Sequence, residues 1–254
     1  MTKIKDVIDA LETFAPTCLK EEYDNVGLMV GNPNEEVKKI ITCLDVTSDV
    51  VSLAIKKGAN LIISHHPLIF NPLYTLDLSE GKGKIIEKCI ANKIAVISEH
   101  TNLDKAAQGM NYKLAEILGG KNIQVQDSVC GVLFDIEKQD VAEFAKLVSL
   151  KLDDDTVTYV DAKKKIKKVF ACTGGGGSDR DNYEFAKANA DVYLSGDFKH
   201  HNYIDAKEDN FAIVSFSHYS SEIIAEDILK DFLVKKVGIQ VITAKQERPF
   251  KTIK

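Results

Sequence analysis

Residues 61–67 read LIISHHP, a short apolar run followed by a serine, two histidines and a proline. A continuous apolar run of this length is typical of a strand that is buried on both faces of a parallel sheet. Pro67 favours extended backbone at His66, so the two imidazoles leave the strand in a stiff segment and point in different directions. The stretch therefore predicts an α/β sheet with polar chemistry at one strand end.

Strand-like and helix-like segments alternate on both sides of this stretch. In the first half we expect helices at residues 3–14, 50–57, 83–92 and 109–118, and further strands at residues 37–44 and 94–97. In the second half we expect strands at residues 129–135, 157–160, 169–172, 192–194, 211–215 and 238–243, with helices at residues 141–150, 183–189 and 222–233. This alternation predicts an α/β fold with largely parallel or mixed sheets and with helices on their faces.

The 254 residues are enough for one large domain or two modest ones. The glycine-containing segment at residues 119–127 is the best candidate boundary. We expect an N-terminal α/β lobe at residues 1–124, completed by about residues 215–254, and a second α/β lobe at residues 125–214. Because no long linker separates them, the two lobes are expected to pack closely.

Composition and charge exclude several classes of protein. The net charge of −5 argues against a broad basic surface for nucleic acid. Five cysteines without CxxC spacing argue against a disulfide framework and against a thiolate zinc site. No apolar run approaches the roughly 20 residues of a membrane span, and the charged N-terminus does not resemble a signal peptide. We therefore expect a cytoplasmic protein with no membrane partner.

The six histidines, at positions 65, 66, 100, 200, 201 and 218, follow predicted strands or begin the next helix. The carboxyl ends of strands are where α/β sheets place their ligand sites. Asp104 follows the strand at residues 94–97, where it could bind metal or cap a helix. His218 and Glu222 are four residues apart, a spacing that places both side chains on one face of a helix. For Glu222 the alternative is a first-turn carboxylate that the helix dipole favours.

Three imidazoles and two carboxylates form the candidate ligand set: His65, His66, Asp104, His218 and Glu222. Five donors overfill one tetrahedral site. They fit one octahedral ion, or two ions about 3.5–4 Å apart with a bridging carboxylate. Nitrogen and oxygen donors without thiolate favour zinc, iron or manganese.

Two further features could contribute to the same chemistry. Residues 173–177, TGGGG, lie between a predicted strand and a helix, where backbone amides could bind an anion or form a tight structural turn. His100 and His201 could act as general acid or base, or could hydrogen-bond a metal ligand or the substrate. For His201 the alternative is a helix-capping or surface-exposed position.

Five motifs in order carry a resemblance to a known family. They are YDNVGL at residues 23–28, SHHPLIF at 64–70, HTNLD at 100–104, SGD at 195–197 with His201 and residues 205–206, and HYSSE at 218–222. Together they resemble the YbgI-like (NIF-three-like) dinuclear metal proteins, whose members are labelled GTP cyclohydrolase type-two homologues. The resemblance extends from about residue 3 to residue 243.

The resemblance implies two α/β lobes with two divalent metal ions bound between them. The ligands of the family fall on the five side chains of the candidate set. The resemblance also implies a toroidal homohexamer and a small-molecule substrate, with a nucleotide as the first candidate. The leading hypothesis is a metal-dependent hydrolase, of GTP cyclohydrolase type if the family label applies. The alternatives are a metal-binding scaffold or regulatory protein without turnover, and a protein of metal storage or delivery.

Overall fold

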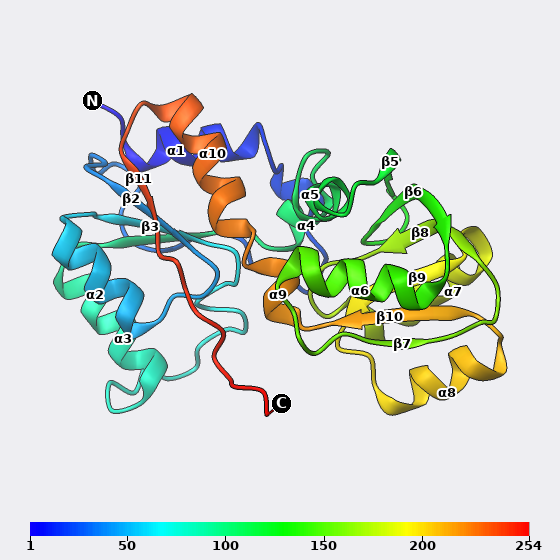
Figure 1. The fold of residues 1–254 in the computed structure, drawn as a ribbon. Helices are drawn as coiled ribbons and strands as arrows, with labels where there is room; N and C mark the ends of the chain where they lie inside the picture. Colours follow the sequence, from blue (N-terminus) through cyan, green and yellow to red (C-terminus); the bar gives the residue numbers. More distant parts are fainter. Residues whose placement is uncertain (254) are drawn as a thin grey trace. The chain divides into compact units, whose positions relative to one another are not determined.

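The computed structural model describes residues 1–253, which divide into two compact units. Unit 1 contains residues 1–106 and 223–247, and unit 2 contains residues 107–222 and the chain from Arg248 onward. Each unit has its own β-sheet with helices packed against it, which confirms the predicted α/β class with parallel and mixed sheets (Figure 1). The units change at residues 106/107 and 222/223, whereas the sequence suggested boundaries after residues 124 and 214.

Unit 1 is built on a five-stranded sheet with the order β1-β4-β3-β2-β11. The strands are β1 (Gly27–Val30), β2 (Ile40–Cys43), β3 (Leu61–Ser64), β4 (Ala95–Ser98) and β11 (Val241–Thr243). Only β1 runs antiparallel to its neighbour, β4. The three central strands are fully buried, as their apolar sequences predict.

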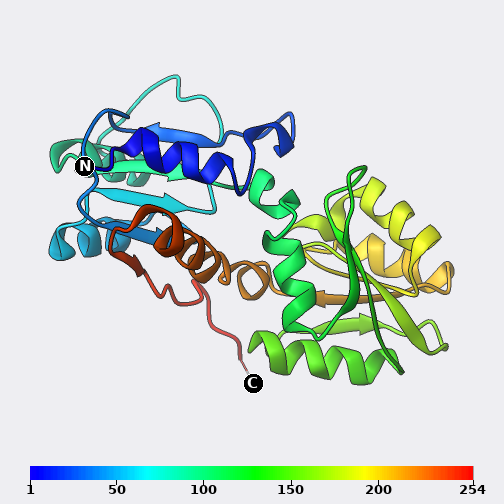
Figure 2. The same ribbon diagram turned by 90° about the horizontal axis from the view of Figure 1, so that it is seen from above.

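Helices cover both faces of the first sheet. The helices of unit 1 are α1 (Ile4–Glu12), η1 (Thr17–Leu19), α2 (Ser48–Lys57), α3 (Gly81–Ala91), α4 (Thr101–Lys105) and α10 (Ala225–Val237). The helices α2 and α3 pack on one face, and α1 and α10 lie together on the other (Figures 1 and 2). The sequence predicted one helix at residues 222–233, but the chain breaks there into α9 (His218–Glu222) and α10.

Unit 2 contains a mixed six-stranded sheet with the order β5-β6-β8-β9-β10-β7. The strands are β5 (Lys121–Val125), β6 (Val132–Gln139), β7 (Thr158–Val160), β8 (Ile166–Ala171), β9 (Val192–Gly196) and β10 (Ala212–Phe216). Parallel pairing joins β8, β9 and β10 at the centre of the sheet, and antiparallel pairing joins the outer strands.

Two hydrophobic clusters cover the two faces of the second sheet. The helices α5 (Met110–Ile117) and α6 (Val141–Leu152) contribute to one cluster, and α7 (Arg180–Asn189) and α8 (His200–Glu208) contribute to the other. A second 3-10 turn, η2 (Gly176–Ser178), precedes α7. Within residues 1–253, no helix combines the length and the hydropathy that a membrane span requires.

Candidate metal centre

Strand register brings the polar residues of unit 1 to one edge of the sheet. Ser64, the last residue of β3, is level with Cys43 of β2 and with Ser98 of β4. The backbone continues this pairing beyond the strands, because the amide of His65 donates to the Cys43 carbonyl at 3.1 Å and the amide of Glu99 donates to the Ser64 carbonyl at 2.9 Å. The residues that follow β3 and β4 are therefore neighbours in space.

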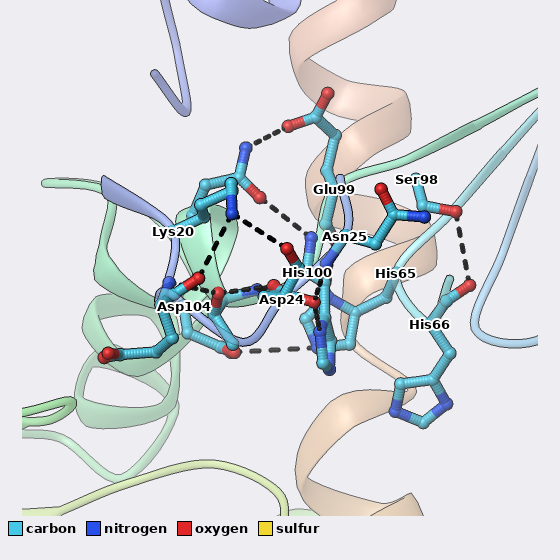
Figure 3. Close-up of polar contacts among 12 residues, drawn as sticks. Lys20, Asp24, Asn25, His65, His66, Ser98, Glu99, His100 and Asp104 are labelled. Carbon is cyan, nitrogen blue, oxygen red and sulfur yellow. Dashed lines mark hydrogen bonds and ion pairs between the residues drawn. The ribbon is translucent and has the colours of Figure 1, made fainter. Parts of the chain in front are cut away.

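His65 is held in the orientation that a metal ligand needs. Its side chain is fully buried, and Nδ1 lies 2.8 Å from the backbone oxygen of Glu99. Because a carbonyl oxygen only accepts, Nδ1 carries the proton and Nε2 carries the lone pair. Nε2 lies 3.7 Å from Oδ1 of Asp104, which is itself buried on α4 (Figure 3). A carboxylate and an imidazole nitrogen that could bind a metal ion thus face each other.

His66 and His100 are oriented in the same way, by carboxylates. Nδ1 of His66 lies 2.8 Å from Oδ1 of Asp45, and Nδ1 of His100 lies 2.8 Å from Oδ1 of Asp24. The potential ligand atoms of these two histidines and His65 all lie within 4.8 Å of one another. We call His65, His66, His100 and Asp104 the first donor set.

The carboxylate of Asp24 is ionised and hydrogen-bonded to Nδ1 of His100. Burial acts to raise its pKa, but hydrogen bonds from His100 and Thr101 outweigh burial and hold the pKa well below its usual range. Thr101 contributes both its hydroxyl, at 2.5 Å, and its amide, at 3.1 Å, to the other carboxylate oxygen. Asp24 therefore stays ionised and keeps the Nδ1 proton of His100 in place.

Unit 2 carries a second donor set, which consists of His218 and Glu222 on α9. Nε2 of His218 lies 2.8 Å from Oε2 of Glu222, as the four-residue spacing predicts. Nδ1 of His218 lies 2.7 Å from Oδ2 of Asp197, which follows β9. Burial acts to lower the pKa of His218, but the hydrogen bonds to these two carboxylates raise the pKa to about 10. A metal ion at Nε2 would take the place of that proton.

The glycine segment of unit 2 packs against Glu222. Gly174 has a φ angle of +60°, and a Cβ atom there would lie 1.9 Å from Oε1 of Glu222. At Gly176 a Cβ atom would lie 2.5 Å from Sγ of Cys172. The segment is therefore a tight turn that leaves room for the Glu222 carboxylate, and an additional anion-binding role stays a prediction.

Of the two predicted catalytic residues, His100 and His201, the second lies on the surface. It is exposed in the first turn of α8, next to the equally exposed His200. His100, in contrast, lies in the first donor set, with a ring nitrogen within 4.8 Å of those of His65 and His66.

Sequence reasoning did not identify the carboxylates that orient the histidines. Asp45 follows β2 and Asp197 follows β9, so the strand-end rule that selected the histidines also applies to them. Asp24 precedes β1, a strand that the sequence did not predict, and only the YDNVGL motif marks its position.

The chemistry of both donor sets fits a divalent metal. Each histidine places Nδ1 against an oxygen acceptor, which is the outer-shell arrangement that metal-binding imidazoles use. Buried carboxylates, Asp104 and Glu222, accompany them, and no cysteine belongs to either set. Within residues 1–253 the fold and these donors thus define an α/β protein with His and carboxylate groups that could hold metal ions.

Comparison with known proteins agrees with this class. The family model Duf34/NIF3 (NGG1p interacting factor 3) matches residues 2–249, and the chain belongs to this family. A Clostridium acetobutylicum protein named GTP cyclohydrolase 1 type 2 homolog is 36% identical over 229 residues, which cover 87% of this chain and 85% of the relative. A Methanocaldococcus jannaschii protein of the same name is 32% identical over 244 residues and covers 95% of this chain and 98% of the relative.

Solved structures share the fold. A Staphylococcus aureus hypothetical protein superposes with a TM-score of 0.89 at 31% identity, over 99% of both chains. Reduced HcgD from Methanocaldococcus jannaschii gives a TM-score of 0.83 at 30% identity, over 96% of this chain and 98% of that one. The Bacillus cereus protein related to NIF3 gives 0.87 at 25% identity, over 99% of both chains.

Substitution of Gly174 by alanine should weaken metal binding at the second donor set. The added methyl group would displace the Glu222 carboxylate, and we expect about a ten- to hundredfold loss of zinc affinity. Gly119→Ala is the matched control, because Gly119 also has a positive φ angle, +76°, but open space around its Cβ position. Equal zinc affinity of the two variants by competition titration would contradict this role for Gly174.

The buried carboxyl group of Glu99 should make the free energy of unfolding decrease as the pH rises from about 5 to about 8. Burial raises its pKa to about 8 from 4.5, although a hydrogen bond from Asn102 acts to lower it. Between these values the folded state binds more protons than the unfolded state, so the free energy of unfolding decreases with pH. We expect Glu99→Gln to flatten this decrease between pH 5 and pH 8 in urea titrations, whereas Glu116→Gln, at an exposed position, should not. Parallel curves for wild type and Glu99→Gln would refute the assignment.

Proposed function

We propose that the protein is a metal-dependent hydrolase that binds two divalent ions with His65, His66, Asp104, His218 and Glu222. The observation that carries the proposal is the fixed orientation of the imidazoles. His65, His66 and His218 each place Nδ1 against an oxygen, which reserves Nε2 for a metal ion. Zinc, iron and manganese suit these donors.

A pair of such ions supplies Lewis acidity and lowers the pKa of water toward neutrality. The residues of the chain have separate tasks. Asp104 and Glu222 would supply carboxylate oxygens to the ions and balance their positive charge. His100 has its Nδ1 proton fixed by Asp24, so its Nε2 can accept a proton and later return it. We assign the acid–base role to His100, and His201 is the second candidate for it.

The names of the relatives suggest the first substrates to test. Two proteins that share about a third of their residues with this chain are named GTP cyclohydrolase 1 type 2 homolog. Nucleotides are therefore the first candidates, and we propose hydrolysis of a ring or phosphoryl bond in such a molecule. A metal-binding scaffold or regulatory protein without turnover is the alternative.

We also propose a homohexameric assembly and a cytoplasmic location. The hexamer rests on the family resemblance of the sequence motifs. The location is supported by the cysteines, whose odd number and lack of CxxC spacing argue against a disulfide framework. Light scattering of the purified protein measures the assembly directly.

Metal analysis of protein purified without added metal tests the centre. We expect about two ions per chain. His65→Ala and His218→Ala should each lower this ratio and abolish hydrolysis, because each removes a ligand. His200→Ala is the matched control, since His200 is an exposed histidine outside both donor sets.

Turnover separates the hydrolase from the alternative. Wild-type protein loaded with the metal found by analysis is assayed against nucleotides, phosphoesters and amides. Two ions per chain without turnover would favour the scaffold. A ratio near zero that added metal does not restore would overturn the metal centre itself.

A further inference from the structure

The tripeptide Tyr23-Asp24-Asn25 contacts two other segments of unit 1, the residues that follow β4 and the loop that follows β3. Asp24 holds His100, as described above. Nδ2 of Asn25 donates to the backbone oxygen of Ile69 at 2.6 Å. The ring of Tyr23 lies next to that of Phe70, with centroids 6.4 Å apart. The tripeptide therefore fixes the position of Phe70 relative to the imidazoles.

Phe70 belongs to a long loop that begins with the two metal-binding histidines. Residues 65–80, between β3 and α3, contain neither helix nor strand. Loops of this length without secondary structure are uncommon inside a compact unit, and binding loops are one of the kinds that occur. The loop also exposes large apolar side chains, namely Phe70, Leu73, Tyr74, Leu76 and Leu78. Such a surface beside a polar site indicates a binding region.

The ring of Phe70 contacts the imidazole of His100, which in turn lies next to His65 and His66. The Phe70 and His100 centroids lie 6.1 Å apart with the rings nearly perpendicular, at 87°. The His100 centroid lies 5.2 Å from that of His65 and 5.7 Å from that of His66. Tyr23 and Phe70 nevertheless stay open to solvent, at 70% and 37% exposure. The accessible ring of Phe70 thus borders the imidazole of His100, and the accessible ring of Tyr23 lies next to Phe70.

We propose that Tyr23 and Phe70 form a platform that binds a flat heteroaromatic ring of the substrate. The face of such a ring stacks on aromatic side chains, while its polar edge suits the imidazoles and their carboxylates. A nucleobase and a pterin share this chemistry. The inference rests on the proposed hydrolase function, and it names the class of molecule that the same site takes.

Calorimetric titration of the metal-loaded protein with three ligands tests the platform. Guanosine monophosphate carries the ring, ribose and phosphate, ribose 5-phosphate lacks the ring, and pterin-6-carboxylate lacks the ribose. We expect guanosine monophosphate to bind at least about tenfold more tightly than ribose 5-phosphate. Comparison with the pterin shows which source of ring the platform prefers.

Variants of Tyr23 and Phe70 test whether the platform causes the preference for ring-bearing ligands. Tyr23→Ala and Phe70→Ala should each reduce the affinity for the ring-bearing ligands by about five- to hundredfold and leave ribose 5-phosphate unchanged. Tyr23→Phe keeps a ring and should keep the affinity. Tyr74→Ala is the control, because Tyr74 is 97% exposed in the same loop but does not belong to the Tyr23–Phe70 pair.

The failure of this inference can be distinguished from failure of the proposed function. Metal content is measured for every protein, and the titrations are repeated after chelation. Two ions per chain without a preference for ring-bearing ligands would overturn the platform alone. A change of subunit association in Tyr23→Ala and Phe70→Ala, without any change in ligand affinity, would also overturn it, since the rings would then serve contacts between copies. A ring preference that survives chelation supports the platform even if the hydrolase proposal fails.

Discussion

The first donor set depends on the register of three parallel strands, which end at the same edge of the sheet. Because Cys43, Ser64 and Ser98 are in register, the residues that follow β2, β3 and β4 emerge together at one edge of the sheet. A shift of one residue in any strand would turn its side chains to the other face and separate the histidines from their acceptors. The same three strands are buried on both faces, so the strands that form the hydrophobic core also set the position of the site.

Oxygen acceptors at Nδ1 orient the histidines of each donor set. The acceptor is a backbone carbonyl for His65 and a carboxylate for His66, His100 and His218. Each bond fixes both the plane of the ring and its tautomer, and it increases the basicity of Nε2. In the second donor set the same arrangement raises the pKa of His218, so a proton and a metal ion compete for Nε2.

The sequence predicted the class of fold and the proximity of His218 and Glu222 better than it predicted the edge strands and the carboxylates that orient the histidines. The central strands were recognisable because burial on both faces requires unbroken apolar runs. The strand β5 was missed because it is only partly buried and its sequence, KNIQV, contains no such run. The strand β1 was missed although residues 28–30 are apolar, and it too is only partly buried. The break between α9 and α10 was missed because the apolar spacing continues across it. Asp24 and Asp197 could not be assigned to histidines, since both pairings depend on tertiary contacts between distant parts of the chain.

X-ray absorption at the edge of the bound metal tests the central claim most directly, because it reports ligand type and the distance between ions without a substrate. The account predicts imidazole and oxygen scatterers together with a second metal about 3.5–4 Å away. A shell of sulfur ligands, or an isolated ion with no second metal in a protein that carries two ions per chain, would contradict it.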